Sequence, residues 1–189
     1  EITTRLVGSE MCIRDRLYYR LTFDITLCNY FLEQTEGLTD DETTRQRAEV
    51  RFIRALNNYY LMDMFGNPPY CDKVSTEKPQ QIQRADLFAK IEEELKEIGD
   101  DATATLAQPL QTTYGRVDRV AAWLLLARMY LNAEVYTGTP QWGKAKEYAQ
   151  KVIDSGYKLA PVYKHLFMAD NDGSNVNKAR QEVILPILQ

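Results

Sequence analysis

Residues 48–70, AEVRFIRALNNYYLMDMFGNPPY, carry the pattern that decides the fold. Apolar side chains recur there at helical spacing and form one stripe, made of Phe52, Ala55, Leu56, Tyr59 and Met62. A second stripe beside it consists of Ile53, Tyr60 and Met64. Gly66 tolerates the left-handed conformation that ends helices, and Pro68–Pro69 prevents the helix from resuming. A helix apolar on two sides packs against two neighbours, so we expect a stack of helices.

Three further helices are predicted around this one. They cover Leu17–Glu36, Arg84–Ile98, and a segment that Asp118 caps and that runs to about Asn132. Thr43–Thr44 are the expected caps of the helix at 48–70. Thr139 is the expected cap of one more helix, with Pro140 at its first position. We expect a loop over Ala133–Thr139 before it.

Trp123, Leu126, Ala127 and Tyr130 match the first helix of a tetratricopeptide repeat, W-x2-L-G-x2-Y, with alanine in place of glycine. The stretch Gly115–Phe167 therefore has the helix-pair organisation of a helical repeat. A protein-protein interaction adaptor of the tetratricopeptide type, which would bind peptides in a concave groove, is one function that this pattern allows.

Several spaced motifs also resemble the SusD/RagB family. Its signature E-A-R-F-x-R-A... F-G-D-x-P resembles the residues Glu49, Arg51–Phe52, Arg54–Ala55, Phe65–Gly66–Asn67 and Pro69. The block Gly115–Phe167 resembles the family's G-R... A-A-x-A-L-L-A-R-x-Y-L... S-G-x-Y-x-L... L-F pattern. Val50 stands where the family has alanine, and Pro68 where it has a branched aliphatic residue, so the path of the loop after the helix departs from the pattern.

The resemblance implies an all-α, tetratricopeptide-like helical superhelix of the SusD type. It also implies non-catalytic glycan binding at the cell surface of Bacteroidetes. Family members are outer-membrane lipoproteins, anchored through an N-terminal cysteine that this chain does not contain. They hand oligosaccharides to a SusC-type TonB-dependent transporter, which is the partner that the resemblance implies here.

The domain boundaries follow from the same comparison. Family members are more than twice as long as these 189 residues, so we interpret residues 17–189 as an N-terminal-to-middle fragment, incomplete at both ends. Val7–Arg16, VGSEMCIRDR, resembles a translated sequencing adaptor. Residues 1–16 are therefore predicted to be a non-native leader.

The composition narrows the classes of partner. A net charge of −4 and a pI near 5.2 argue against nucleic acid, because neutralising phosphates needs a basic surface. We predict no cofactor and no metal site, since the three cysteines lack metal-ligand spacing and His165 is the only histidine. Asp170–Asn175 begins like a calcium loop but has neither the glycine nor the final glutamate of one.

No enzyme is expected either. The chain has none of the nucleophile, zinc-protease, phosphate-loop or dinucleotide motifs, and His165 has no evident catalytic partner. The run Glu92–Glu94 is interpreted as a solvated helix face. Arg54, on the signature helix, is predicted to make buried or half-buried polar contacts.

Aromatic side chains in loops are the candidate ligand contacts. Sugar rings stack their C–H faces on aromatic rings, while their hydroxyls need polar neighbours. Most aromatic residues here lie at helical spacing and are expected in the core. Tyr70 lies in a proline-rich loop after Asn67, and Tyr114 lies in a second loop, so helical spacing does not place either residue in the core. We therefore predict ligand-binding roles for Asn67, Tyr70 and Tyr114, with loop-pinning structural roles as the alternative.

Overall fold

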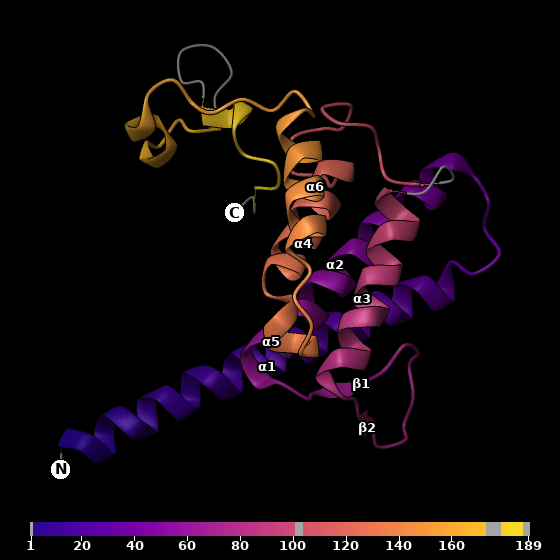
Figure 1. The fold of residues 1–189 in the computed structure, drawn as a ribbon. Helices are drawn as coiled ribbons and strands as arrows, with labels where there is room; N and C mark the ends of the chain where they lie inside the picture. Colours follow the sequence, from indigo (N-terminus) through magenta and orange to yellow (C-terminus); the bar gives the residue numbers. More distant parts are fainter. Residues whose placement is uncertain (1, 101–103, 173–178, 187–189) are drawn as a thin grey trace. The chain divides into compact units, whose positions relative to one another are not determined.

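The protein is an all-α chain in the computed structural model, which describes residues 2–100, 104–172 and 179–186, with side chains from Ile13 onward (Figure 1). The described elements are helices apart from two strands of two residues each. The chain divides into two compact units, Glu1–Glu94 and Leu95–Gln189. The division falls within helix α3 (Arg84–Gly99).

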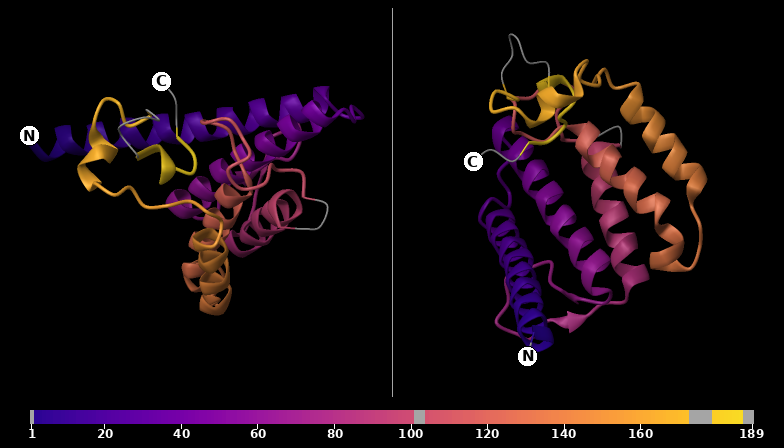
Figure 2. Two further views of the ribbon diagram at one scale, coloured as in Figure 1. Left: turned by 90° about the horizontal axis from the view of Figure 1, so that it is seen from above. Right: turned by 90° about the vertical axis from the view of Figure 1, so that its left-hand side faces the viewer.

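In the first unit, α1 (Ile2–Gln34) packs along α2 (Asp41–Phe65) (Figures 1 and 2). Leu21 and Ile25 of α1 are buried against Leu61 of α2. The rings of Tyr18 and Phe65 meet edge to face beside them, with centroids 5.2 Å apart. The periodic apolar residues of both helices thus make the core that the sequence predicts.

Helix α1 begins earlier than expected. It starts at Ile2 instead of Leu17, so the backbone of the predicted leader, residues 1–16, is helical from Ile2 onward. The side chains of residues 2–12 lie outside the described part. The non-native origin of this leader stays a prediction.

The predicted apolar stripe on helix α2 is confirmed, but the predicted N-cap and one residue of the second stripe are wrong. Phe52, Ala55, Tyr59 and Met62 are buried, while Met64, assigned to the second stripe, is exposed. The cap is Asp40, whose Oδ1 accepts the N–H of Thr43 at 2.9 Å, so the expectation for Thr43–Thr44 is wrong. Gly66 ends the helix with φ of +78°, as predicted.

The segment between α2 and α3 contains a minimal hairpin. Strand β1 (Pro69–Tyr70) pairs antiparallel with β2 (Gln80–Gln81). The N–H of Ile82 donates to the carbonyl of Pro68 at 3.0 Å and extends the pairing by one bond. This pairing fixes the two ends of a segment that the sequence predicts to be a loop.

Arg54 is half-buried and has polar partners, as predicted. It forms an ion pair with Glu94 of α3 and donates from Nη1 to Asn29 Oδ1 of α1 at 2.9 Å. Arg51 donates from Nε to the same Glu94 oxygen at 3.2 Å. The side chain of Glu94 is only 13% exposed, so its assignment to a solvated face is wrong. The two arginines that pair with Glu94 lie 43 and 40 positions earlier in the chain, so the spacing of residues within α3 does not reveal them.

In the second unit, α4 (Arg119–Leu131) and α6 (Trp142–Ile153) lie side by side (Figure 1). The rings of Tyr130 and Tyr148 contact each other between them, with centroids 5.4 Å apart. Gly99, at the end of α3, allows close approach to α4, because a Cβ there would lie 2.7 Å from that of Ala122. Trp123 is half-buried and donates from Nε1 to the carbonyl of Gly99 at 3.0 Å.

The link between α4 and α6 differs from the prediction. Ala133–Thr137 forms a short helix, α5, which Gly138 ends with φ of +76°. Helix α6 begins at Trp142 after Gln141, which makes no side-chain capping bond, so the cap expected at Thr139 is wrong. Instead, the hydroxyl of Thr137 accepts the N–H of Thr139 at 3.2 Å.

The end of the chain contains two short 3₁₀ helices, η1 (Tyr163–Phe167) and η2 (Ala179–Gln181). Of the calcium-like segment Asp170–Asn175, the residues from Gly173 onward lie outside the described part. Within the described residues, no helix combines the length and apolar character that crossing a membrane requires.

Candidate functional site

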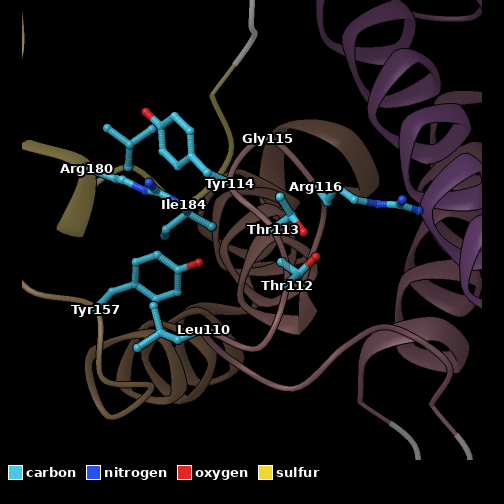
Figure 3. Close-up of a pocket in the computed structure, with 10 residues that line it drawn as sticks. Leu110, Thr112, Thr113, Tyr114, Gly115, Arg116, Tyr157, Arg180 and Ile184 are labelled. Carbon is cyan, nitrogen blue, oxygen red and sulfur yellow. The ribbon is translucent and has the colours of Figure 1, made fainter. Parts of the chain in front are cut away.

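The second unit contains a hollow of about 140 Å³, formed by two loops and the segment around η2 (Figure 3). One water molecule needs about 10–15 Å³ by the same kind of measure, so the hollow has room for several water molecules. Its lining combines aromatic, aliphatic, hydroxyl and guanidinium groups: Leu110, Thr112, Thr113, Tyr114, Gly115, Arg116, Tyr157, Arg180, Val183 and Ile184. Such mixed linings are typical of small-molecule sites.

The carboxylate of Asp118 holds the walls of this hollow together. Asp118 is fully buried. Its Oδ1 caps α4 by accepting the N–H groups of Val120 and Ala121, at 2.9 and 3.3 Å. Its Oδ2 accepts the N–H of Leu110 at 3.2 Å and the hydroxyl of Tyr157 at 2.9 Å. One side chain therefore fixes a helix start, a turn and an aromatic ring, and the prediction of Asp118 as a cap is confirmed.

Leu110 occupies an unusual backbone position in one wall. Its φ is +61°, and it is the one positive-φ residue other than glycine among the described residues. The N–H of Gln111 donates to the carbonyl of Gln108 at 3.1 Å, so Gln108–Gln111 forms a turn with Pro109 before Leu110. Glycine is favoured at this position of such a turn, and a left-handed residue with a Cβ costs roughly 1–2 kcal/mol.

The ring of Tyr114 forms the opposite part of the lining. The Cζ of Arg180 lies 4.4 Å from the centroid of this ring, in a cation–π contact. Figure 3 shows the Tyr114 and Tyr157 rings on one side of the hollow and Thr112 and Thr113 on the other. Tyr114, predicted from its place in a loop, is thus found in the wall of the hollow.

Two hydroxyl groups show the electrostatics of the site. Burial raises the pKa of Tyr157, and the charge of Asp118 and the hydrogen bond donated to it raise it further. The Oγ1 of Thr112 is buried and has no hydrogen-bond partner among the described residues. A buried hydroxyl left in this state costs about 1–3 kcal/mol.

The chemistry of this lining suits binding. It offers apolar surface and hydrogen-bond donors, while the Asp118 carboxylate is already occupied by N–H and O–H donors. His165 lies in η1 and does not line the hollow. Among the residues that the structure describes, no group of three or more metal-ligating side chains comes together.

Asn67 and Tyr70 belong to the first unit and do not line the hollow. The Oδ1 of Asn67 accepts the N–H of Arg84 at the start of α3, and its carbonyl accepts Nε2 of Gln81, both at 2.8 Å. The Nζ of Lys90 lies 5.0 Å from the centroid of the Tyr70 ring. Burial raises the pKa of Tyr70. The exposed Asn67 and the half-buried Tyr70 therefore belong to a separate candidate contact at the hairpin.

Three lining residues, Leu110, Tyr157 and Arg180, are not predictable as site residues from their sequence context. Pro109 before Leu110 was the available signal for a turn, because proline is common at its second position. Nothing in the sequence linked Tyr157 to Asp118, 39 positions earlier. The contact between Arg180 and Tyr114 spans an even longer separation.

Comparison with known proteins identifies the family of this chain. A family of SusD-like proteins, described as starch-binding and associating with the outer membrane, matches residues 15–131. The chain belongs to the SusD-like family. This confirms the resemblance that the helix at 48–70 and the Gly115–Phe167 block carry.

Individual relatives agree with this membership. The chain is 52% identical over 173 residues, 92% of its length, to the starch-binding protein SusD of Bacteroides thetaiotaomicron. The chain also matches a crystal structure with a xylogluco-oligosaccharide, at a TM-score of 0.75 and 25% identity. This match covers 89% of the present chain and 34% of the other one. The structure of a SusD-like protein of Bacteroides fragilis matches at a TM-score of 0.72 and 20% identity. This match covers 92% of the present chain and 33% of the other one. The chain spans about a third of these relatives' lengths, 30% in the case of SusD.

Proposed function

We propose that this SusD-like chain is part of a non-catalytic glycan-binding protein that captures oligosaccharides at the outer surface of the cell. The observation that carries this proposal is the 52% identity, over 92% of the chain, to a relative named as starch-binding. A structural relative at 25% identity was crystallised with a xylogluco-oligosaccharide. The first relative is named for binding starch, and the second was crystallised with an oligosaccharide. The proposed ligand class is therefore the oligosaccharide.

We place the ligand contacts at the three residues predicted from sequence, with unequal weight. Tyr114 lines a hollow that has both apolar and donor groups, which is the combination that a sugar needs. Tyr70 carries a half-buried ring under the ammonium of Lys90. Asn67 already bonds to Arg84 and Gln81, so we expect it to act mainly by holding the loop of Tyr70.

The proposed partner is a SusC-type TonB-dependent transporter of the outer membrane, and the proposed location is the cell surface, held by a lipid anchor. Family membership supports both. A packed array of helices offers the broad, rigid lateral surface that docking on a large partner requires. Co-purification of the complete lipoprotein with the transporter from solubilised outer membranes tests this; recovery of the lipoprotein alone would count against it.

Calorimetric titration with a panel of oligosaccharides tests the binding function directly. Malto-oligosaccharides and xylogluco-oligosaccharides are the first probes, with chromatography of the sugars after incubation. We expect heat of binding and unchanged sugars. Cleavage of the sugars would contradict the non-catalytic assignment. Absence of glycan binding together with saturable peptide binding would favour the tetratricopeptide-type adaptor.

A further inference from the structure

We propose that Leu110 is a ligand-contacting residue of the hollow, which takes one neutral pyranose ring with its apolar C–H face against the Leu110 side chain. This inference rests on the proposed glycan-binding function and deepens it. Leu110 belongs to none of the motifs discussed above. Its backbone conformation and its place in the lining of the hollow point to a role in binding.

Leu110 has an unusual backbone conformation. Its φ of +61° is one that leucine rarely adopts. Its side chain is 55% exposed, so burial in a core does not explain why a large apolar residue stands where glycine fits better. Backbone strain of this kind concentrates at ligand-binding positions, where the surrounding structure enforces it.

Two hydrogen bonds hold the backbone of Leu110 in this conformation, and Gly156 leaves room for its side chain. The turn bond joins Gln111 to Gln108 at 3.1 Å. The Leu110 N–H is held by Asp118. A side chain built on Gly156 would come within 3.3 Å of Leu110 Cδ1, and the φ of +99° at Gly156 also disfavours any side chain there. Leu110 is therefore held in place at the edge of the hollow (Figure 3).

The rest of the lining combines apolar groups with hydrogen-bond donors. The Tyr114 ring, Val183 and Ile184 add apolar surface, and the guanidinium of Arg180 adds N–H donors. The carboxylate of Asp118, which holds Leu110 and Tyr157 in the lining, is occupied by internal donors. The hollow thus offers apolar contact and hydrogen-bond donors, which match the C–H face and the hydroxyl oxygens of a neutral sugar.

Titration of maltoheptaose into the wild type and into the variants Leu110→Ala and Leu110→Gly tests the proposal. We expect both variants to bind at least fivefold more weakly. Leu110→Gly should also melt higher than the wild type, by about 2–4 °C, because it removes the strained Cβ. Leu38→Ala is the matched control, since Leu38 is 53% exposed, lies in a loop and does not line the hollow. It should bind like the wild type.

The outcomes separate this inference from the proposed function. If the wild type binds maltoheptaose and both Leu110 variants bind it equally well, the role of Leu110 is refuted and glycan binding stands. An equal loss in Leu38→Ala would also refute it, because the effect would then not be specific to the hollow. If the wild type binds none of the glycans in the panel, the proposed function itself fails.

Discussion

Each of the two units contains a buried or half-buried carboxylate, and the two carboxylates bind different kinds of partner. Glu94 pairs with two guanidinium groups, those of Arg51 and Arg54, and so links helix α3 to α2 through opposite charges. Asp118 is more deeply buried, and its donors among the described residues are neutral: three backbone N–H groups and one phenol. The first arrangement joins regular helices. The second fixes irregular loops in one geometry, which a binding site needs.

Replacing Asp118 by alanine should have the largest effect on stability. The change removes the α4 cap, worth about 1 kcal/mol, and leaves the Leu110 N–H and the Tyr157 hydroxyl without their acceptor, at about 1–3 kcal/mol each. We expect a loss of about 3–5 kcal/mol by urea denaturation. Asp118→Ser should recover about 1 kcal/mol, because serine restores the cap alone. A loss below 1 kcal/mol for Asp118→Ala would show that the carboxylate does not organise these loops.

Replacing Glu94 by alanine should cost less, about 2–3 kcal/mol. Two half-buried guanidiniums lose their anion, but Arg54 keeps Asn29 as a partner. Glu93→Ala, at the exposed neighbouring position, is the control and should stay within about 0.5 kcal/mol of the wild type. Equal effects of the two substitutions would mean that Glu94 is only a surface charge. If Glu94→Ala exceeded Asp118→Ala, the contrast drawn above would be reversed.

Much of the helical fold could be predicted from sequence because apolar spacing encodes it directly. The stripe on α2 and the apolar residues of α3, Leu87, Ile91, Leu95 and Ile98, are buried as expected. Helix caps were harder to predict from sequence. Asp40 and Thr43 lie within four residues of each other and either can cap α2, and the sequence does not say where the chain turns. Helix α5 has five residues, too few to show a period.

The site was predictable only in part. Tyr114 was identified because a loop aromatic is not explained by helical packing. Glu94 was misassigned because its partners lie on α2, and spacing within α3 carries no information about them. The strain at Leu110 is set by the turn and by Asp118 together, so the residue type alone gave no sign of it.

Tyr157 predicts a dependence of stability on alkaline pH. Its pKa is raised in the folded protein by burial and by Asp118, so the neutral phenol is favoured by folding. Its stabilising contribution is complete below the ordinary phenol pKa of about 10 and is lost as pH rises above that value. We expect Tyr157→Phe to be less stable near neutral pH, by about 1 kcal/mol, and to lose less stability between about pH 10 and 12. Parallel losses in both proteins would contradict this.

Replacing Thr112 should have an effect about as small as that of Tyr157→Phe, but of the opposite sign. Replacing its unpartnered hydroxyl by a methyl group in Thr112→Val removes a buried polar oxygen, so we expect a gain of about 1 kcal/mol in thermal unfolding. Thr113→Val is the neighbouring control, at an exposed position, and should change stability by less than about 0.5 kcal/mol. A loss of stability in Thr112→Val would show that this hydroxyl has a partner.

Calorimetric titration of maltoheptaose into Tyr114→Ala tests most directly whether the hollow organised by Asp118 is a sugar site. Tyr19→Ala is the matched control, since Tyr19 is an exposed tyrosine on α1 that does not line the hollow. We predict that Tyr114→Ala weakens binding about tenfold, or 1.4 kcal/mol, and that Tyr19→Ala leaves it unchanged. Equal affinities of the wild type and Tyr114→Ala would contradict the assignment of the hollow.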